Sequence, residues 1–184
     1  MMLATNGHPS QPAAIPSGSP HETAAGTVWQ RGGVEIWDAG PADAEEVARL
    51  LHDFNVEFDT PSPGVDVLAP RLRVLLAEPS TVALLAGRPA VAVALVTFRT
   101  NVWYEGPVAL LDELYVVPHL RDEGIGTAVL GRLFALADER AAGLIEINVD
   151  EGDVDTRRFY ERHGFQATEA GSDERAFYYW MELE

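Results

Sequence analysis

Two glycines, Gly124 and Gly126, stand where an apolar run of the chain gives way to a long amphipathic one. The apolar, partly β-branched run ends at Pro118 and predicts a strand, and the apolar residues after Gly124 recur at helical spacing. Glycine lets the backbone approach a ligand closely at such a turn. The N–H groups of residues 124–127 would therefore converge on an anion, as a cradle for the pyrophosphate of a nucleotide-like cofactor.

The spacing of these glycines excludes two common phosphate-binding motifs. The third glycine of a dinucleotide fingerprint would fall on Val129, and no lysine with a serine or threonine follows as in a Walker loop. The pattern present is RxxGxG, from Arg121 to Gly126, and FYERHGF follows downstream, from Phe159 to Phe165. Together these two motifs resemble the acyl-CoA signature of the GNAT superfamily of N-acyltransferases, and they cover most of the C-terminal half.

The resemblance implies that acetyl-CoA is the co-substrate. Backbone groups of the strand before the glycines would hold the pantetheine arm, and the first turn of the helix would hold the pyrophosphate. This strand and the one expected at residues 144–149 would splay apart to admit the thioester. The cofactor-binding residues implied are Leu114, Tyr115, Val116, Arg121, Gly124, Ile125, Gly126, Thr127 and Asp153.

Acyl transfer from a thioester to an amine needs a neutral amine and a proton for the departing thiolate. Tyr160 stands at the position of the superfamily's general acid, and a phenol with a pKa of about 10 is well matched to protonating a thiolate. The alternative is that Tyr160 packs with Phe159 in the core.

Two carboxylates are candidates for the general base. Asp112 is the first, because it lies two residues before Leu114 and so is expected on the same strand face. A carboxylate stands at this position in some polyamine acetyltransferases of the superfamily. Glu113, expected on the other face, is the second candidate. The alternatives are solvated strand-end acids and deprotonation through water.

Three acidic residues depart from the superfamily pattern. Asp122 and Glu123 stand where members usually carry a glycine and a basic residue, and their charge would oppose a pyrophosphate by about 1 kcal/mol. Asp153 replaces an asparagine seven residues before Tyr160 and suits a helix N-cap. These departures weaken the expected affinity for CoA.

The acceptor site is expected between the end of the first helix and the turn before the strand at residues 108–117. Aromatic rings beside carboxylates suit a cation there, although Phe54 and Phe58 also fit simple core packing. The five histidines do not cluster at metal-ligand spacing, so no metal site is expected. The residues expected to line the acceptor site are Phe54, Glu57, Phe58, Asp59, Pro61, Trp103, Tyr104 and Glu105.

The composition predicts one domain of residues 31–184 after a flexible, Pro/Ser/Ala-rich tail of residues 1–30. The 184-residue chain has no cysteine, no apolar run of membrane-spanning length and no secretory signal, so we expect a cytoplasmic protein. Its formal net charge of -16 argues against nucleic acid and anionic membranes as partners and favours cations, unless the charge serves solubility alone.

The pattern of elements predicts the fold class. In order, it reads β-α-α-β-β-β-α-β-α-β-β, which is also the order shown by the GNAT superfamily. We expect an α/β sandwich with a central mixed, mostly antiparallel sheet flanked by helices. The expected strands are 33–38, 81–86, 90–100, 108–117, 144–149, 165–168 and 176–183, and the expected helices are 41–58, 65–77, 125–142 and 153–163.

These observations predict an N-acetyltransferase that moves an acetyl group from acetyl-CoA to a primary amine of a small, cationic molecule. The amine would attack directly in a ternary complex. One alternative acceptor is a protein N-terminus or a lysine. Another reading, motivated by Asp122, Glu123 and Asp153, is a non-catalytic acyl-CoA-binding module. The superfamily is often dimeric, so a homodimer is a further expectation.

Overall fold

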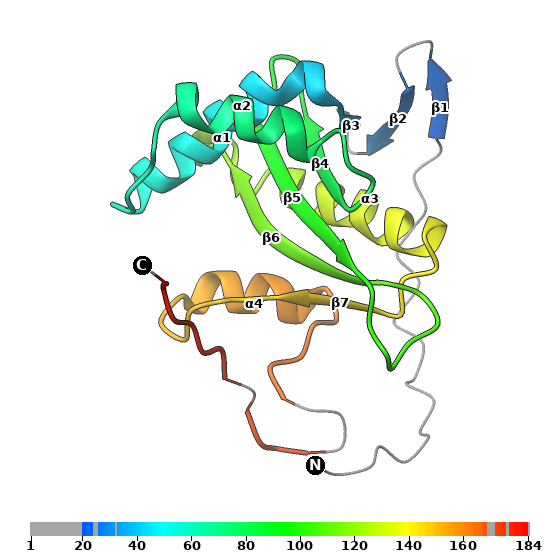
Figure 1. Ribbon diagram of the computed structural model, residues 1–184, viewed down its shortest axis with the longest axis vertical. Coiled ribbons are helices and arrows are strands. Elements are labelled where there is room, and N and C mark those ends of the chain that lie inside the picture. The colour runs from blue at the N-terminus through cyan, green and yellow to red at the C-terminus, as the bar shows by residue number, and fades with distance from the viewer. Residues whose placement is uncertain (1–19, 24–25, 32, 169–171, 176, 184) are drawn as a thin grey trace. The chain divides into compact units, whose positions relative to one another are not determined.

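The computed structural model describes residues 20–23, 26–31, 33–168, 172–175 and 177–183 (Figure 1). The chain divides into two compact units, one from Ser17 to Ile147 and one that contains residues 148–184. No helix among the described residues is long and apolar enough to cross a membrane.

The first unit holds the sheet and the longer helices. Its strands are β1 (Pro20–Thr23), β2 (Gly26–Arg31), β3 (Val34–Ala39), β4 (Thr81–Ala86), β5 (Ala92–Arg99), β6 (Val108–Val116) and β7 (Leu144–Ile147). Its α-helices are α1 (Ala44–Glu57), α2 (Val65–Leu75) and α3 (Ile125–Glu139), and single 3₁₀ turns span Pro41–Asp43 and Pro118–Leu120. The second unit contains α4 (Val154–Arg162).

The strands lie in the sheet in sequence order. Each neighbouring pair is antiparallel except β6 and β7, which are parallel. Parallel neighbours need a crossover connection, and α3 supplies it between these two strands. The sheet is therefore mixed and mostly antiparallel with flanking helices, which confirms the expected fold class.

One face of the sheet is covered by α1 and α2. The apolar stripe predicted for the first helix is present, and Val47, Leu50 and Leu51 of α1 are buried. They belong to one buried cluster with residues of α2 and of the sheet, among them Leu72, Trp37, Leu85 and Val93. Removal of this apolar surface from water holds the two helices against the strands.

The opposite face is covered by α3 (Figure 1). Side chains alternate along a strand, so Asp38 of β3 points away from the face that buries its neighbour Trp37. Asp38 contacts Arg132 of α3, which places the helix on that side. Leu130 and Leu133 of α3 are fully buried.

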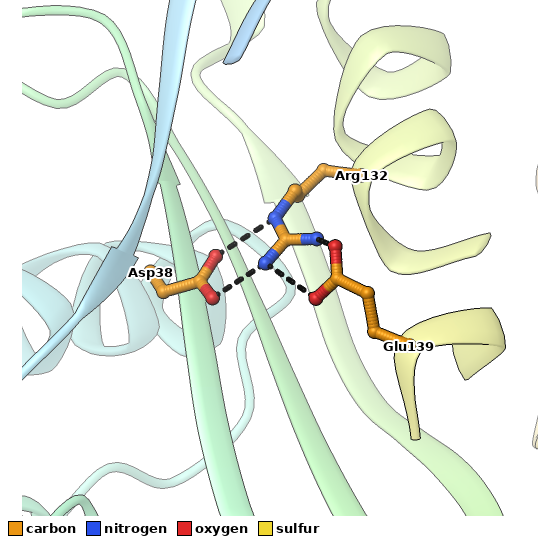
Figure 2. A network of polar contacts seen from close by, with 3 residues as sticks. All are labelled: Asp38, Arg132 and Glu139. Atoms are coloured by element: carbon orange, nitrogen blue, oxygen red, sulfur yellow. Dashed lines mark hydrogen bonds and ion pairs between the residues drawn. The ribbon is translucent and has the colours of Figure 1, made fainter. Parts of the chain in front are cut away.

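A buried arginine ties α3 to the sheet (Figure 2). The Arg132 side chain is only 3% exposed, and its Nε and Nη2 lie 2.9 and 2.7 Å from the two oxygens of Asp38. Nη1 lies 2.8 Å from Oε1 of Glu139, the last residue of α3. Burial alone would lower the pKa of Arg132, but the hydrogen bonds and charges of the two carboxylates outweigh it and raise the pKa. The guanidinium therefore stays charged inside the fold.

The N-terminal part of the sheet extends into the segment predicted to be a tail. Residues 20–23 and 26–30 of that segment form β1 and most of β2. Composition does not reveal this, because β2 is specified by its backbone pairing with β3, in which Val28 is opposite Trp37. The predicted tail at residues 1–19 lies outside the described residues.

The prediction of two closing strands at the C-terminus is wrong for the described residues. Residues 165–168 and 177–183 contain only an isolated antiparallel bridge, between Thr168 and Arg175. Phe177, Tyr178 and Trp180 are exposed in this segment. Aromatic residues favour strands only where a neighbouring strand pairs with them and buries one face, and the sequence pattern cannot supply that partner.

Candidate active site

The edge of β6 becomes unpaired halfway along the strand. The ladder with β7 runs from Val108 opposite Leu144 to Leu111 opposite Ile147. Among the described residues, β6 continues to Val116 beyond the last β7 partner. Among the described strands, the backbone of residues 112–116 therefore has no partner on that edge, at the strand that the resemblance assigns to the pantetheine arm.

A β-bulge lies where the β6–β7 ladder ends. Leu95 of β5 pairs with Glu113 and Val96 pairs with Leu111, so Asp112 has no partner in the β5–β6 register. Such a bulge opposes two residues of one strand to one residue of its neighbour. Thr97 donates a hydrogen bond to Oδ2 of Asp112 over 2.6 Å.

The bulge puts both carboxylates on the same side of the sheet. Cross-strand partners share a face, so Glu113 lies on the side of Leu95, which packs against the α1–α2 cluster. Thr97 is two residues from Leu95 and shares that side with Asp112. The expectation that Asp112 shares the face of Leu114 is therefore wrong, because the bulge interrupts the alternation. Glu113 lies on the face opposite to Leu114, as expected, since Leu114 pairs with Ala94.

The proximity of the two carboxylates changes their acidity. Burial, and then the negative charge of Asp112, raise the pKa of Glu113 from 4.5 to about 7. Burial also raises the pKa of Asp112, although the hydrogen bond from Thr97 partly opposes this. A carboxylate that titrates near neutral pH is suited to accept a proton from an amine.

The predicted anion cradle is formed by the start of α3. Gly124 adopts the left-handed conformation with φ of 80°, and a side chain there would meet no atom within 4 Å. The first intrahelical hydrogen bond runs from the Ala128 N–H to the Gly124 carbonyl. The N–H groups of Ile125 and Gly126 precede that bond, at the start of the helix, where an anion would be stabilised. The donor set therefore fits the pyrophosphate of an acyl-CoA.

Two of the acidic departures from the superfamily pattern flank this cradle. Asp122 and Glu123 are exposed, and Asp122 is left-handed with φ of 63°. Exposed charges are partly screened, so they weaken but do not remove the attraction between the helix start and an anion.

Arg121, the first residue of the motif, is paired within the fold. Nη1 and Nη2 lie 2.7 and 2.9 Å from the two oxygens of Glu57, and Nε donates to the Val116 carbonyl over 3.0 Å. The guanidinium also lies 5.7 Å from the centre of the Tyr115 ring. The sequence singled out all four of these residues, but it contains no signal that pairs Arg121 with Glu57.

The end of α1 carries an aromatic group beside this ion pair. The ring of Phe54 lies 5.1 Å from that of Phe58 and 5.6 Å from that of Tyr115. Burial and the nearby Glu57 raise the pKa of Tyr115. These residues bring the expected acceptor side and the end of β6 together.

The loop after α1 is held by a second contact. His52 Nδ1 lies 2.8 Å from the Ser62 hydroxyl, which also accepts a hydrogen bond from the Gly64 N–H over 3.3 Å. This loop contains Asp59 and Pro61, which the sequence assigns to the acceptor site. Neither His52 nor Ser62 stands out in the sequence, because each is an isolated polar residue there.

The turn of Trp103, Tyr104 and Glu105 does not join this group. It precedes Val108 at one end of β6, whereas the cradle follows Val116 at the other, about 26 Å away for a strand of this length. Trp103 is 86% exposed. The three residues therefore lie near the end of β6 that is far from the cradle.

The second unit carries Asp153 and Tyr160. Asp153 is the N-cap of α4, and its carboxylate accepts a hydrogen bond from the Thr156 N–H over 3.1 Å, as expected for an N-cap. Tyr160 is buried, and its ring lies 5.2 Å from that of Phe159 and 5.4 Å from that of Phe165. Core packing and a catalytic hydroxyl are compatible roles for this residue.

Across the described ranges, no group of three or more histidine, aspartate, glutamate or cysteine side chains is placed to hold a metal ion.

Comparison with known proteins identifies the family. The acetyltransferase (GNAT) family matches residues 45–165. A protein from Arthrobacter sp. FB24, described as a candidate acetyltransferase, is 52% identical, covering 80% of this chain and 95% of its own, with a TM-score of 0.76. None of the curated proteins matches the chain.

Two more distant structures share the fold. An aminoglycoside acetyltransferase from an uncultured soil metagenomic sample, in complex with sisomicin, is 16% identical over 82% of this chain and 97% of its own, with a TM-score of 0.69. AAC(6')-Iy, in complex with the bisubstrate analog CoA-S-monomethyl-acetylneamine, is 15% identical over 82% of this chain and 99% of its own, with a TM-score of 0.65. The matched family region contains both the bulge and the cradle, and the chain belongs to the GNAT acetyltransferase family.

Proposed function

We propose that this protein transfers an acetyl group from acetyl-CoA to the primary amine of a small, cationic molecule. The observation that carries the proposal is the carboxylate pair at the β6 bulge, where the pKa of Glu113 is raised to about 7. The pair stands at the start of the unpaired edge of β6, on the strand that leads into the cradle. Under this proposal, the groups that bind the donor and the group that deprotonates the acceptor belong to one strand–turn–helix unit.

Acetyl-CoA supplies an activated acetyl group as a thioester. Backbone groups of Leu114, Tyr115 and Val116 would hold its pantetheine arm along the open edge of β6. The N–H groups of Gly124, Ile125, Gly126 and Thr127 would surround its pyrophosphate. In this arrangement the backbone, rather than basic side chains, supplies most of the affinity.

Glu113 is the base that we favour. An alkylamine is mostly protonated at neutral pH, so a proton must leave before its nitrogen can attack the thioester carbonyl. Glu113 would accept that proton, either directly or through a water molecule, since its pKa of about 7 leaves much of it ionised near neutral pH. The negative charge of Asp112 would help to raise the pKa of Glu113, and Asp112 remains the alternative base.

Attack of the amine forms the new C–N bond, and the C–S bond to CoA then breaks. The departing thiolate takes up a proton, which we assign to the Tyr160 hydroxyl on the basis of the superfamily motif around it. Asp153 would support the pantetheine arm in this scheme, while its carboxylate caps α4.

A cationic acceptor is supported by two observations. The net charge of -16 and the carboxylates at the bulge favour positively charged partners. The distantly similar aminoglycoside acetyltransferase is described in complex with sisomicin, although its identity of 16% reflects fold alone. We place the protein in the cytoplasm, where acetyl-CoA is available, and a homodimer remains an expectation.

The test has two steps. Calorimetric titration with acetyl-CoA should show saturable binding, and a screen for thiol release over polyamines, aminoglycosides, neutral amines and peptides should then show turnover with a cationic small molecule. Turnover restricted to peptides would favour a protein N-terminus or lysine as acceptor. Binding without thiol release from any amine would favour the non-catalytic acyl-CoA-binding module, and no binding would refute the function.

A further inference from the structure

The arginine of the RxxGxG motif is paired with groups of α1 and β6. Both terminal nitrogens of Arg121 face the two oxygens of Glu57 in a bidentate pair, at 2.7 and 2.9 Å. Its third nitrogen, Nε, donates to the Val116 carbonyl at 3.0 Å. Bidentate arginine–carboxylate pairs are among the strongest and most directional hydrogen-bonded contacts in proteins.

The pair is set into the fold rather than suspended in solvent. The side chains of Arg121 and Glu57 are 39% and 25% exposed, which leaves most of each in contact with protein. The ring of Tyr115 lies beneath the guanidinium and is buried against Phe54. The cation is thus held by a carboxylate, a carbonyl and an aromatic face.

Glu57 and Arg121 belong to two different segments of the first unit. Glu57 is the last residue of α1, and Arg121 follows the Pro118–Leu120 turn, three residues before Gly124. Between Arg121 and α3 the backbone passes through left-handed positions at Asp122 and Gly124. Such positions persist where surrounding structure determines them, and Arg121 is the side chain that anchors this turn to α1 and β6.

We infer that Arg121 and Glu57 are a positioning pair for CoA binding. Arg121 sets the place of the cradle turn and neutralises Glu57, and it acts on the cofactor through that turn rather than by pairing with the pyrophosphate. The inference rests on the proposed function, because it concerns the site that would bind acetyl-CoA. It also predicts that Glu57, a residue on the expected acceptor side, affects the affinity for the donor.

A double-mutant cycle tests the inference. Calorimetric titration of CoA is carried out on the wild type, Glu57→Gln, Arg121→Gln and the double variant. Each single substitution should weaken CoA binding by about fivefold or more, and the double variant should be no weaker than the weaker-binding single variant, since both substitutions break one contact. Arg121→Lys should not restore the affinity, because an ammonium cannot reproduce the bidentate geometry.

Two further readouts separate positioning from general destabilisation. At saturating amine, the substitutions should raise the KM for acetyl-CoA by a larger factor than they lower kcat, because the pair acts on the binding of the donor. Glu35→Gln is a matched control, since Glu35 forms an ion pair with Arg88 at 2.9 Å and its side chain is 32% exposed. This control should bind CoA as the wild type does, even if its thermal midpoint falls as far as that of Glu57→Gln.

Equal or tighter CoA binding by Glu57→Gln would overturn the inference, because it would mean that freeing Arg121 helps the pyrophosphate directly. Additive losses in the double variant would overturn it as well. A wild type that fails to bind CoA would refute the proposed function, and the inference with it, whereas the first two outcomes leave the function standing.

Discussion

At the scale of single residues, the chemistry of this protein depends on how neighbouring groups change the pKa and the position of a side chain. Glu113 becomes a base that titrates near neutrality because it is buried next to Asp112, and the Thr97 hydroxyl holds Asp112 in place. Tyr160 packs against the rings of Phe159 and Phe165. The two residues therefore call for different tests, one of acidity and one of a hydroxyl group.

Glu113→Gln should lower kcat/KM by about 100-fold, the size expected for the loss of a general base. In the wild type the rate should rise with pH through about 7, because only the ionised carboxylate accepts a proton. The variant should lack this rise. Asp112→Asn is the matched control, and the rise should move to lower pH in it, because one negative charge beside Glu113 is gone. A pH–rate profile of Glu113→Gln that matches the wild type would exclude this residue as the base.

The same carboxyl group should be visible in the stability of the fold. Its pKa is raised from 4.5 to about 7 in the folded protein, so the protonated form is the one that the fold favours. Its contribution to the free energy of unfolding is fully present below pH 4.5 and is lost as the pH rises through about 7. Urea unfolding at pH 5 and pH 8, wild type against Glu113→Gln, measures this difference.

Tyr160→Phe should lower turnover by about 100-fold while the affinity for acetyl-CoA stays nearly unchanged. The substitution keeps the ring contacts with Phe159 and Phe165 and removes only the hydroxyl group. Steady-state kinetics, with the thermal midpoint as a control for folding, is the measurement. Turnover equal to that of the wild type would assign Tyr160 to core packing alone.

At the scale of elements, the site depends on where α3 begins and on what holds the helix in place. Its first turn offers backbone N–H groups, and its buried residues and Arg132 attach it to the sheet. The cradle is therefore a property of the helix position as well as of the glycines.

Gly126→Val should lower CoA affinity at least tenfold, about 1.4 kcal/mol, because a branched side chain would occupy the space next to the converging N–H groups. Glu123→Gln, which removes an exposed negative charge beside the same turn, should leave the affinity equal or improve it. Calorimetric titration of CoA compares the two variants. Wild-type affinity in the valine variant would show that the pyrophosphate does not bind here.

Asp38→Ala should destabilise the fold by about 3 kcal/mol, because it leaves the buried Arg132 guanidinium with one of its two carboxylate partners. Glu139→Ala should cost less, since the Glu139 side chain is 49% exposed and Asp38 still pairs with Arg132. Denaturant unfolding of both variants gives the comparison. A larger loss in Glu139→Ala would mean that the helix end, rather than β3, holds the arginine.

At the scale of the whole molecule, the charge of -16 is distributed unevenly with respect to the site. Glu57 is neutralised by Arg121, and Glu105 lies beyond the far end of β6, so neither acts as a free carboxylate near the cradle. Asp112, Glu113 and Asp59 remain as candidates to attract a cation.

The apparent second-order rate for a cationic amine should therefore fall as ionic strength rises, because interactions between exposed charges are screened beyond about 8 Å at physiological salt. A neutral amine of similar size should show little change. Initial rates against salt concentration for both amines are the measurement. A flat response for the cation would leave the net charge as a feature of solubility.

Most of the elements that could be predicted follow from patterns of residues that are close in sequence. The strand, the glycine turn and the helix around Gly124 follow from residues close in sequence, and so do the stripe of α1 and the N-cap at Asp153. The closing strands failed because a strand requires a partner, and the partner's position is not written in the strand's own residues. The early start of the sheet at β1 was missed for the same reason.

The sequence by itself determined the family, the order of the main elements and the residue types of the cradle, because these depend on spacing along the chain. Only the tertiary structure decided that Asp112 and Glu113 share one side of the sheet, since a one-residue bulge in the β5–β6 register moves Asp112 to the face opposite to the one expected. Only the tertiary structure paired Arg121 with Glu57, which is 64 residues away. Strand register and contacts between distant residues are set by packing of the whole unit, and no local pattern specifies them.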